Sequence, residues 1–237
     1  MASVPSTGRQ PADANGPPPA LPPLRHGERM DQKTFHARYE AMPPDFRAEL
    51  IGGVVHVPSP LKRQHGRVHA KVIQWLSEYE DATPGTEAFD NASAILDEQA
   101  EPQPDACLLI VVPGLGQTRN EDDYITGAPE LIVEVAETSE PVDLGAKRAD
   151  YERAGVREYI VVSLRQRRVI WFVRRGTSLE EVGPGPDGVF RSEVFPGLWL
   201  DAAALLRQDG RRVLEVLRQG LATPEHAAFI TRLAAPP

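Results

Sequence analysis

The stretch "PELIVEVAETSEPVDLGAKRADYERAGVREYIVV", residues 129–162, contains two apolar runs separated by a polar segment. The runs "ELIVEVAE" and "REYIVVSL" are typical of buried strands. The segment "VDLGAKRADYERAG" between them predicts a helix that Asp143 caps and Gly155 closes. Two strands joined through a helix are usually parallel neighbours in one sheet, so this stretch predicts a mixed α/β fold.

Glu134 lies inside the first of these apolar runs. A carboxylate is costly to bury unless it is paired with an opposite charge or binds a metal ion. Its position therefore predicts a partner elsewhere in the chain.

The bulk composition sets further limits. A chain of 237 residues predicts one sizeable domain with appendages. Cys107 is the single cysteine, so an internal disulfide is impossible, and we expect this residue to be buried in a protein of a reducing compartment. The sequence shows neither a signal-peptide pattern nor an apolar run of the ~18 residues that a membrane span needs. These features predict a cytoplasmic protein with no membrane span.

The formal net charge of −8 argues against a protein that coats nucleic acid, because such binding depends on lysine and arginine. The charge is unevenly distributed, however. The stretches "LKRQHGRVHAK" and "RQRRVIWFVRR" contain four and five basic residues and no acidic ones. A local basic face beside an acidic pocket is compatible with this pattern.

The remaining organisation follows from local patterns. Residues 1–23 hold seven of the 23 prolines and predict a disordered tail, followed by a domain over 24–205 and a helical C-terminal extension over 206–237. Other patterns predict the following elements: a short helix capped by Asp31, a hairpin around Gly52-Gly53, a helix over 61–80, strands within 86–96, 104–112 and 167–175, a polar loop over 113–129, and helices over 202–219 and 224–233.

Asp105 opens an apolar strand 29 residues before Glu134. If the two strands are neighbours, their carboxylates lie side by side and repel each other unless a cation separates them. Such oxygen-rich sites suit Mg²⁺ or Mn²⁺. Lys147, one helical turn after Asp143, could position water or stabilise phosphate charge, and Tyr151 lies one turn further along. This set predicts metal-assisted hydrolysis of a phosphodiester.

Simpler interpretations of the same residues stay open at this point. Asp105 could be a turn residue at the start of a strand. Lys147 could be a solvated helix residue paired with Asp143 or Asp150, and Glu134 could bond only to an arginine. The residue types alone do not identify a substrate.

Several ordered segments resemble one family. "ELIGG", "VVHVPSP", His65, "PQPDACLLIV", "GAPELIVEVAETS", "DLGAKRADYERAGVREYIVV" and "FPGLWLD" are similar to the Uma-two family of restriction-endonuclease-like proteins, over about residues 31–205. That family resembles the PD-(D/E)XK nucleases. The resemblance implies a mixed sheet flanked by helices, a divalent metal ion (Mg²⁺ or Mn²⁺) and cleavage of DNA.

The resemblance also implies roles for single residues. Asp105 and Glu134 correspond to the metal-binding carboxylates of the motif. Ala136 stands where the motif lysine is expected, and Lys147 looks like its replacement. Glu49 corresponds to a glutamate that helps to hold the metal, although an exposed strand residue is an equal alternative.

Two histidines, His65 and His69, lie one helical turn apart in "HGRVH". This spacing could bind zinc, but Gly66 stands where the zinc-protease pattern requires glutamate. We expect His65 to lie near the cleft and His69 to be an ordinary helix residue.

The chain departs from the family pattern at three places. Gly52-Gly53-Val54 replaces Asp-Gly-Glu, Glu137-Thr138 replaces Ser-Pro, and Ser163 replaces an aspartate. The leading hypothesis is a metal-dependent DNA endonuclease, with a homodimer expected because cutting two strands often uses two sites. The rivals are a catalytically inactive nuclease-fold module that acts through protein or nucleic-acid binding, and an enzyme acting on another phosphorylated substrate.

Overall fold

The computed structural model describes residues 21–60 and 62–235. The predicted disordered tail lies outside the described residues up to position 20. At its predicted end, the carbonyl groups of Pro22 and Pro23 accept hydrogen bonds of 2.9 and 2.7 Å from the Arg38 guanidinium. The chain is therefore attached to the folded part from Pro22 onward.

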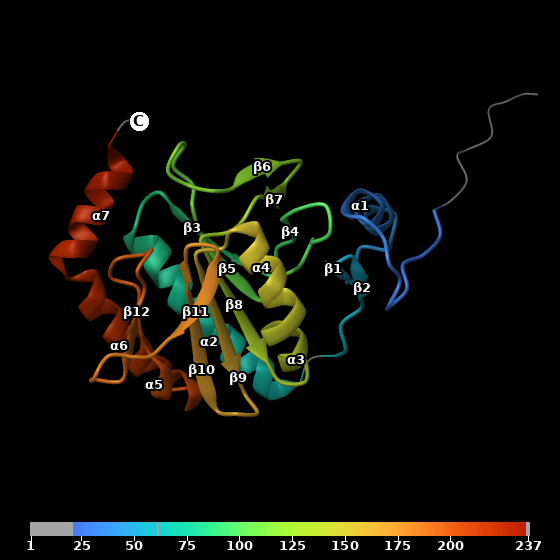
Figure 1. Cartoon of the computed structure of the whole chain (residues 1–237). Helices are drawn as coiled ribbons and strands as arrows, with labels where there is room; N and C mark the ends of the chain where they lie inside the picture. The colour runs from blue at the N-terminus through green and yellow to red at the C-terminus, as the bar shows by residue number, and fades with distance from the viewer. Residues whose placement is uncertain (1–20, 61, 236–237) are drawn as a thin grey trace, which may run out of the picture.

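A central mixed sheet organises the described residues (Figure 1). Its strands run in the order β11-β10-β9-β8-β5-β3, and β8 and β9 form its parallel pair, with Glu134 opposite Val161. The predicted crossover and the mixed α/β class are thus confirmed. The strands of this sheet are β3 (Thr86–Asp90), β5 (Ala106–Ile110), β8 (Leu131–Ala136), β9 (Glu158–Ser163), β10 (Arg168–Arg175) and β11 (Ser178–Val182).

Helices cover both faces of this sheet, which explains why β5, β8 and β9 are buried along their whole length. Leu131, Val133 and Val135 of β8 face a core built with α2 (Arg63–Ala82). Ile132 and Ala136 face the opposite core, built with α4 (Arg148–Ala154). Because side chains alternate along a strand, Glu134 points to the α4 side.

The crossover segment is helical from Glu140 to Ala154. It consists of α3 (Glu140–Val142), one π-helical turn η1 (Asp143–Lys147) and α4, and Gly155 ends it with a positive φ of 102°. The prediction that Asp143 caps this helix is wrong, because the helix begins three residues earlier with Pro141 in its first turn. Proline is favoured in the first turn of a helix because the backbone N–H groups there have no hydrogen-bond partner within the helix, so the missing N–H of proline costs nothing.

A small N-terminal unit packs beside the sheet (Figure 1). It contains α1 (Gln32–Glu40) and the hairpin of β1 (Glu49–Ile51) and β2 (Val54–His56). The predicted cap is confirmed, since the Asp31 side chain accepts the Thr34 N–H. Leu50 and Glu101 exchange backbone hydrogen bonds of 3.0 and 2.9 Å, which connect this unit to the irregular segment that leads into Asp105.

Several short strands were not predicted. The segment 113–129 contains a hairpin of β6 (Arg119–Glu121) and β7 (Tyr124–Thr126), and β7 pairs with β4 (Ala94–Ile95). Residues 189–201 supply β12 (Val189–Arg191) and β13 (Trp199–Asp201), which pair with each other.

Three helices end the described chain: α5 (Ala202–Leu206), α6 (Gly210–Leu221) and α7 (Pro224–Ala234). The helices predicted over 202–219 and 224–233 are present, with a break before α6 where Gln208 has a positive φ of 62°. Val213 and Leu217 of α6 and Phe229 of α7 belong to the same buried cluster as the sheet and α2. Within the described residues, the helices lack the combined length and apolar character that a membrane span requires.

The contact of α6 with the central core gives a test of its structural role. Leu217 is fully buried, so Leu217→Ala should lower the free energy of unfolding by about 2–5 kcal/mol through lost contacts and a residual cavity. Arg211→Ala, at an exposed position of the same helix, should change it by less than about 0.5 kcal/mol. Denaturant unfolding measures both. Equal, small effects would show that α6 lies outside the cooperative core.

Candidate active site

Lys147 lies at the centre of a buried charged cluster. Its Nζ is 2.9 Å from Glu134 Oε1 and 2.7 Å from Glu49 Oε1, and the residue is 5% exposed. Burial alone would lower the pKa of Lys147. The carboxylates of Glu134 and Glu49 outweigh this effect and raise the pKa well above its ordinary value. Lys147 is therefore a charged ammonium group and not the solvated helix residue of the simpler interpretation.

Glu134 is buried on β8, and one of its carboxylate oxygens accepts two hydrogen bonds. Besides Lys147, the Tyr151 hydroxyl donates to Glu134 Oε1 at 2.8 Å. Burial raises the pKa of Glu134 well above its ordinary value, and nearby Asp143 adds to the rise against the opposing charge of Lys147. The partner of Glu134 is thus a lysine on the crossover helix and not an arginine.

Asp105 immediately precedes β5, which is the neighbour of β8 in the sheet, since Ala106 at the start of β5 is opposite Val133 of β8. Its Oδ2 accepts the Val135 N–H at 2.6 Å, and its Oδ1 is 3.4 Å from His65 Nε2. Burial would raise the pKa of Asp105, but the His65 imidazole, the Val135 N–H and the Lys147 charge together outweigh burial and hold the pKa below its ordinary value. Asp105 is therefore ionised.

Glu49 reaches the cluster from the N-terminal hairpin. Its Oε1 accepts the Gln103 N–H at 2.8 Å in addition to contacting Lys147, and its side chain is 14% exposed. The alternative of an exposed strand residue therefore does not apply to Glu49.

Asp143 is a further buried acid beside this cluster. Burial raises its pKa to about 6. In the π-helical turn, the Arg148 N–H reaches back to Asp143 O, and both Asp143 and Lys147 are buried. Such turns are rare and occur often at functional sites. Sequence reasoning placed Asp143 one helical turn from Lys147 but assigned it to a cap, and so did not include it among the candidate site residues.

The charge balance of this cluster fits a divalent cation. Four carboxylates contribute to the electrostatics here, from Glu49, Asp105, Glu134 and Asp143, against one lysine and the His65 imidazole. Carboxylate oxygens are the ligands that Mg²⁺ and Mn²⁺ prefer. The residues present thus fit the metal ion that the family resemblance implies.

His69 also lies beside Asp105, which the expectation of an ordinary helix residue did not include. Its Nε2 lies 2.7 Å from the backbone oxygen of Asp105 and 3.1 Å from Asp90 Oδ1. The spacing of His65 and His69, one helical turn apart on α2, was the feature of the sequence that indicated a shared location. The contact with Asp105 depends on how α2 crosses the sheet, which the local pattern does not give.

The positions that depart from the family pattern have structural partners. The Gly52 N–H donates to Asp150 at 2.8 Å, Glu137 pairs with Lys62 at 3.0 Å, and the Ser163 hydroxyl donates to Glu140. These contacts join the hairpin, α2 and the end of β9 to the crossover segment.

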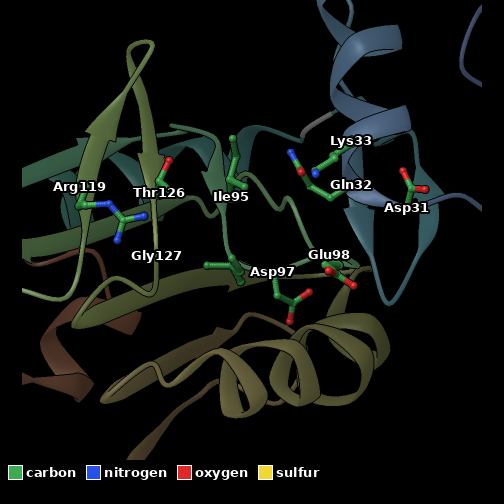
Figure 2. A pocket seen from close by; sticks show the side chains of 10 residues that line it. Asp31, Gln32, Lys33, Ile95, Asp97, Glu98, Arg119, Thr126 and Gly127 are labelled. Atoms are coloured by element: carbon green, nitrogen blue, oxygen red, sulfur yellow. The ribbon is translucent and has the colours of Figure 1, made fainter.

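A hollow of about 600 Å³ lies elsewhere, between the start of α1 and the β6–β7 hairpin (Figure 2). Several of its charged groups already have partners. Asp31 caps α1, Asp97 binds Arg153 at 2.8 Å, and Arg119 binds Glu121 at 2.9 Å. These pairings give Asp31, Asp97 and Arg119 structural roles.

A second hollow, of about 400 Å³, is basic and lies on the helix that carries His65. It is lined by Arg63, Gln64 and Arg67 of α2 and by Gln208 from the turn before α6. Arg63 and Arg67 are exposed and lie one turn apart.

Comparisons with known proteins agree with this architecture. The model of the Uma2 (Uma-two) family, described as "Putative restriction endonuclease", matches residues 34–203. A crystal structure of a "putative nuclease belonging to DUF820" from Anabaena variabilis ATCC 29413 is similar, with a TM-score of 0.55 and 14% sequence identity, over 72% of this chain and 97% of that chain. This likeness shows a shared fold. No curated protein matches the chain.

Removing the Lys147 charge tests the electrostatics of the cluster. Lys147→Met should destabilise the protein by about 3–5 kcal/mol at pH 8, because it leaves buried carboxylates unpaired. Burial already raises the pKa values of Glu134 and Asp143 in the folded state, so these two groups take up protons in the folded protein before they do so in the unfolded chain as the pH falls. The loss of stability in Lys147→Met, relative to the wild type, should therefore become smaller as the pH falls from 8 to 5.

Melting temperatures across this pH range provide the measurement for Lys147→Met. The control is Lys62→Met, whose side chain is 65% exposed and should show little effect at any pH. A deficit that stays constant with pH would contradict the proposed repulsion among the carboxylates.

Proposed function

The chain belongs to the Uma2 family, and from this premise we propose that it is a metal-dependent endonuclease that hydrolyses phosphodiester bonds of DNA. The observation that supports this proposal most is the contact of Lys147 with both Glu134 and Glu49. Asp105 immediately precedes β5, the strand that pairs with the strand of Glu134. The carboxylates of Glu134 and Glu49 stabilise the buried ammonium group of Lys147 in the absence of substrate. The acidic groups outnumber the lysine, so negative charge is left over that a metal cation could neutralise.

Asp105 and Glu134 would hold a Mg²⁺ or Mn²⁺ ion. When bound, such an ion would activate water and neutralise charge on the phosphate. Glu49 lies close enough to Lys147 to hold its ammonium group near the same carboxylates.

The protein's own groups have distinct roles in this proposal. The Lys147 ammonium group would donate to water or to a phosphate oxygen as negative charge develops there. The Tyr151 hydroxyl orients Glu134 through its 2.8 Å hydrogen bond. His65 keeps Asp105 ionised, because its imidazole lies 3.4 Å from Asp105 Oδ1.

A nucleic-acid substrate is supported by the basic hollow at the start of α2. Arg63 and Arg67 extend into solvent on the helix that places His65 beside Asp105. Phosphate groups bound there would bring a neighbouring phosphodiester toward the acidic cluster. The net charge of −8 means that this local basic face must overcome a repulsive background. Cleavage of both strands by single-site subunits would require a second copy, so a homodimer remains part of the proposal.

Cleavage of plasmid DNA at low salt with Mg²⁺ or Mn²⁺ tests the proposed reaction. Glu134→Gln preserves the size of the side chain and removes its charge, so it should weaken metal binding and abolish most cleavage. Lys147→Ala should retain metal binding and slow cleavage by about 10²–10³-fold, the usual effect of losing one stabilising donor.

Glu121→Gln, at an exposed position on β6, is the matched control and should cleave as the wild type does. Equal cleavage by all variants would point to a contaminant or to a different site. Metal binding without cleavage by the wild type would favour the catalytically inactive, nuclease-fold module. The residues Gly52 and Val54, which depart from the family pattern, are the reason for testing this alternative.

The basic hollow gives a separate prediction on DNA affinity. If Arg63 and Arg67 each neutralise one phosphate, the double variant R63A/R67A should reduce the slope of log K against log salt by about 1.8. Fluorescence anisotropy with a labelled duplex in EDTA measures this slope. Arg232→Ala, on α7, should leave it unchanged, and an unchanged slope in the double variant would place the DNA surface elsewhere.

A further inference from the structure

His65 and His69 bring two imidazole rings to the same end of the sheet as Asp105. Their ring centroids are 5.8 Å apart on one face of α2. One ligand atom from each of His65, His69 and Asp105 lies within 4.8 Å of the other two. Two histidines one helical turn apart form a recurrent pair of ligands for zinc.

The pair of His65 and Asp105 already has the spacing of metal ligands. Zn–N and Zn–O bonds of about 2.0–2.2 Å in a tetrahedral site separate neighbouring ligand atoms by about 3.4 Å. The observed distance from His65 Nε2 to Asp105 Oδ1 is 3.4 Å. Within the described part of the chain, no group completes a hydrogen bond of good geometry to this buried nitrogen. His65 is 6% exposed, so this nitrogen is a buried polar atom whose hydrogen bonding is incomplete beside Asp105.

We infer that His65, His69 and Asp105 form a binding site for a divalent first-row transition-metal ion such as Zn²⁺. Imidazole nitrogens favour such ions over Mg²⁺, which prefers oxygen ligands. In the metal-free protein, His69 Nε2 lies 2.7 Å from the backbone oxygen of Asp105, so metal binding at this nitrogen would replace that hydrogen bond and release its proton. Asp90 is the nearest candidate for a fourth ligand, since its Oδ1 lies 3.1 Å from His69 Nε2 and its side chain is 57% exposed. A water molecule would otherwise occupy that position.

This site shares Asp105 with the proposed Mg²⁺ site. Asp105 Oδ2 accepts the Val135 N–H, so Oδ1 is the oxygen available to a metal. Zn²⁺ bound to the histidines would therefore withdraw Asp105 from Glu134. On the basis of the proposed function, Zn²⁺ should inhibit cleavage that depends on Mg²⁺, and this inhibition should require His69.

Direct metal binding tests the inference without any need for catalysis. Zn²⁺ is titrated into the full-length protein in competition with a chromophoric chelator, and Co²⁺ is used as a probe whose visible absorption reports nitrogen ligands. The wild type should bind one ion. His69→Gln should weaken binding by at least about tenfold, since even the loss of an outer-shell partner has that effect.

Three further variants make the result specific. His65→Gln should weaken Zn²⁺ binding as His69→Gln does, which guards against a folding defect in either one. His26→Gln, an exposed histidine near β2, should bind like the wild type. Glu134→Gln should also retain Zn²⁺ affinity while it impairs Mg²⁺-dependent cleavage, so the failure of the proposed nuclease activity and the failure of this site are distinguishable.

Equal Zn²⁺ affinity in His69→Gln, His65→Gln and the wild type would overturn the inference. Absence of binding by the wild type, or loss of binding in His26→Gln, would also overturn it. Zn²⁺ inhibition of cleavage that persists in His69→Gln would show that the ion acts at another site.

Discussion

The burial of the Lys147 ammonium group between carboxylates from different segments is the interaction on which the site depends. Glu134 comes from β8, Glu49 from the N-terminal hairpin, and Lys147 from the π-helical turn of the crossover. A buried charge without a partner is strongly unfavourable, so these segments are held in one arrangement. The hairpin and the central sheet are thereby joined at the place where the chemistry is proposed.

The same interaction explains why the site suits a cation. One lysine offsets only part of the negative charge, and burial raises the pKa values of Glu134 and Asp143, so a further positive group would stabilise their ionised forms. The histidines of α2 supply a second kind of ligand at Asp105. Asp105 lies between the carboxylates of the proposed Mg²⁺ site and the two histidines of α2. Which metal ion occupies Asp105 can therefore control activity.

Sequence patterns were sufficient to predict those parts of the fold that depend on elements close together in the sequence. The crossover between Glu134 and Lys147 is short in sequence, so the strand, helix and parallel strand could be predicted together. Glu49 and His69 act across long sequence separations, and their contacts with Lys147 and Asp105 depend on packing. The β6–β7 hairpin was missed because its residues are mostly polar and its turn places Asp122 and Asp123 at positive φ without glycine. The apolar stripes of α6 and α7 predicted helices but not the core they share with α2.

The most direct test of the account is calorimetric titration of Mg²⁺ into the wild type and into Glu134→Gln at neutral pH. Mg²⁺ is the informative ion because it discriminates against the histidine ligands of α2. The account predicts one binding event in the wild type, which is lost or strongly weakened in the variant. Indistinguishable titrations of the two proteins would contradict a metal site built on Glu134.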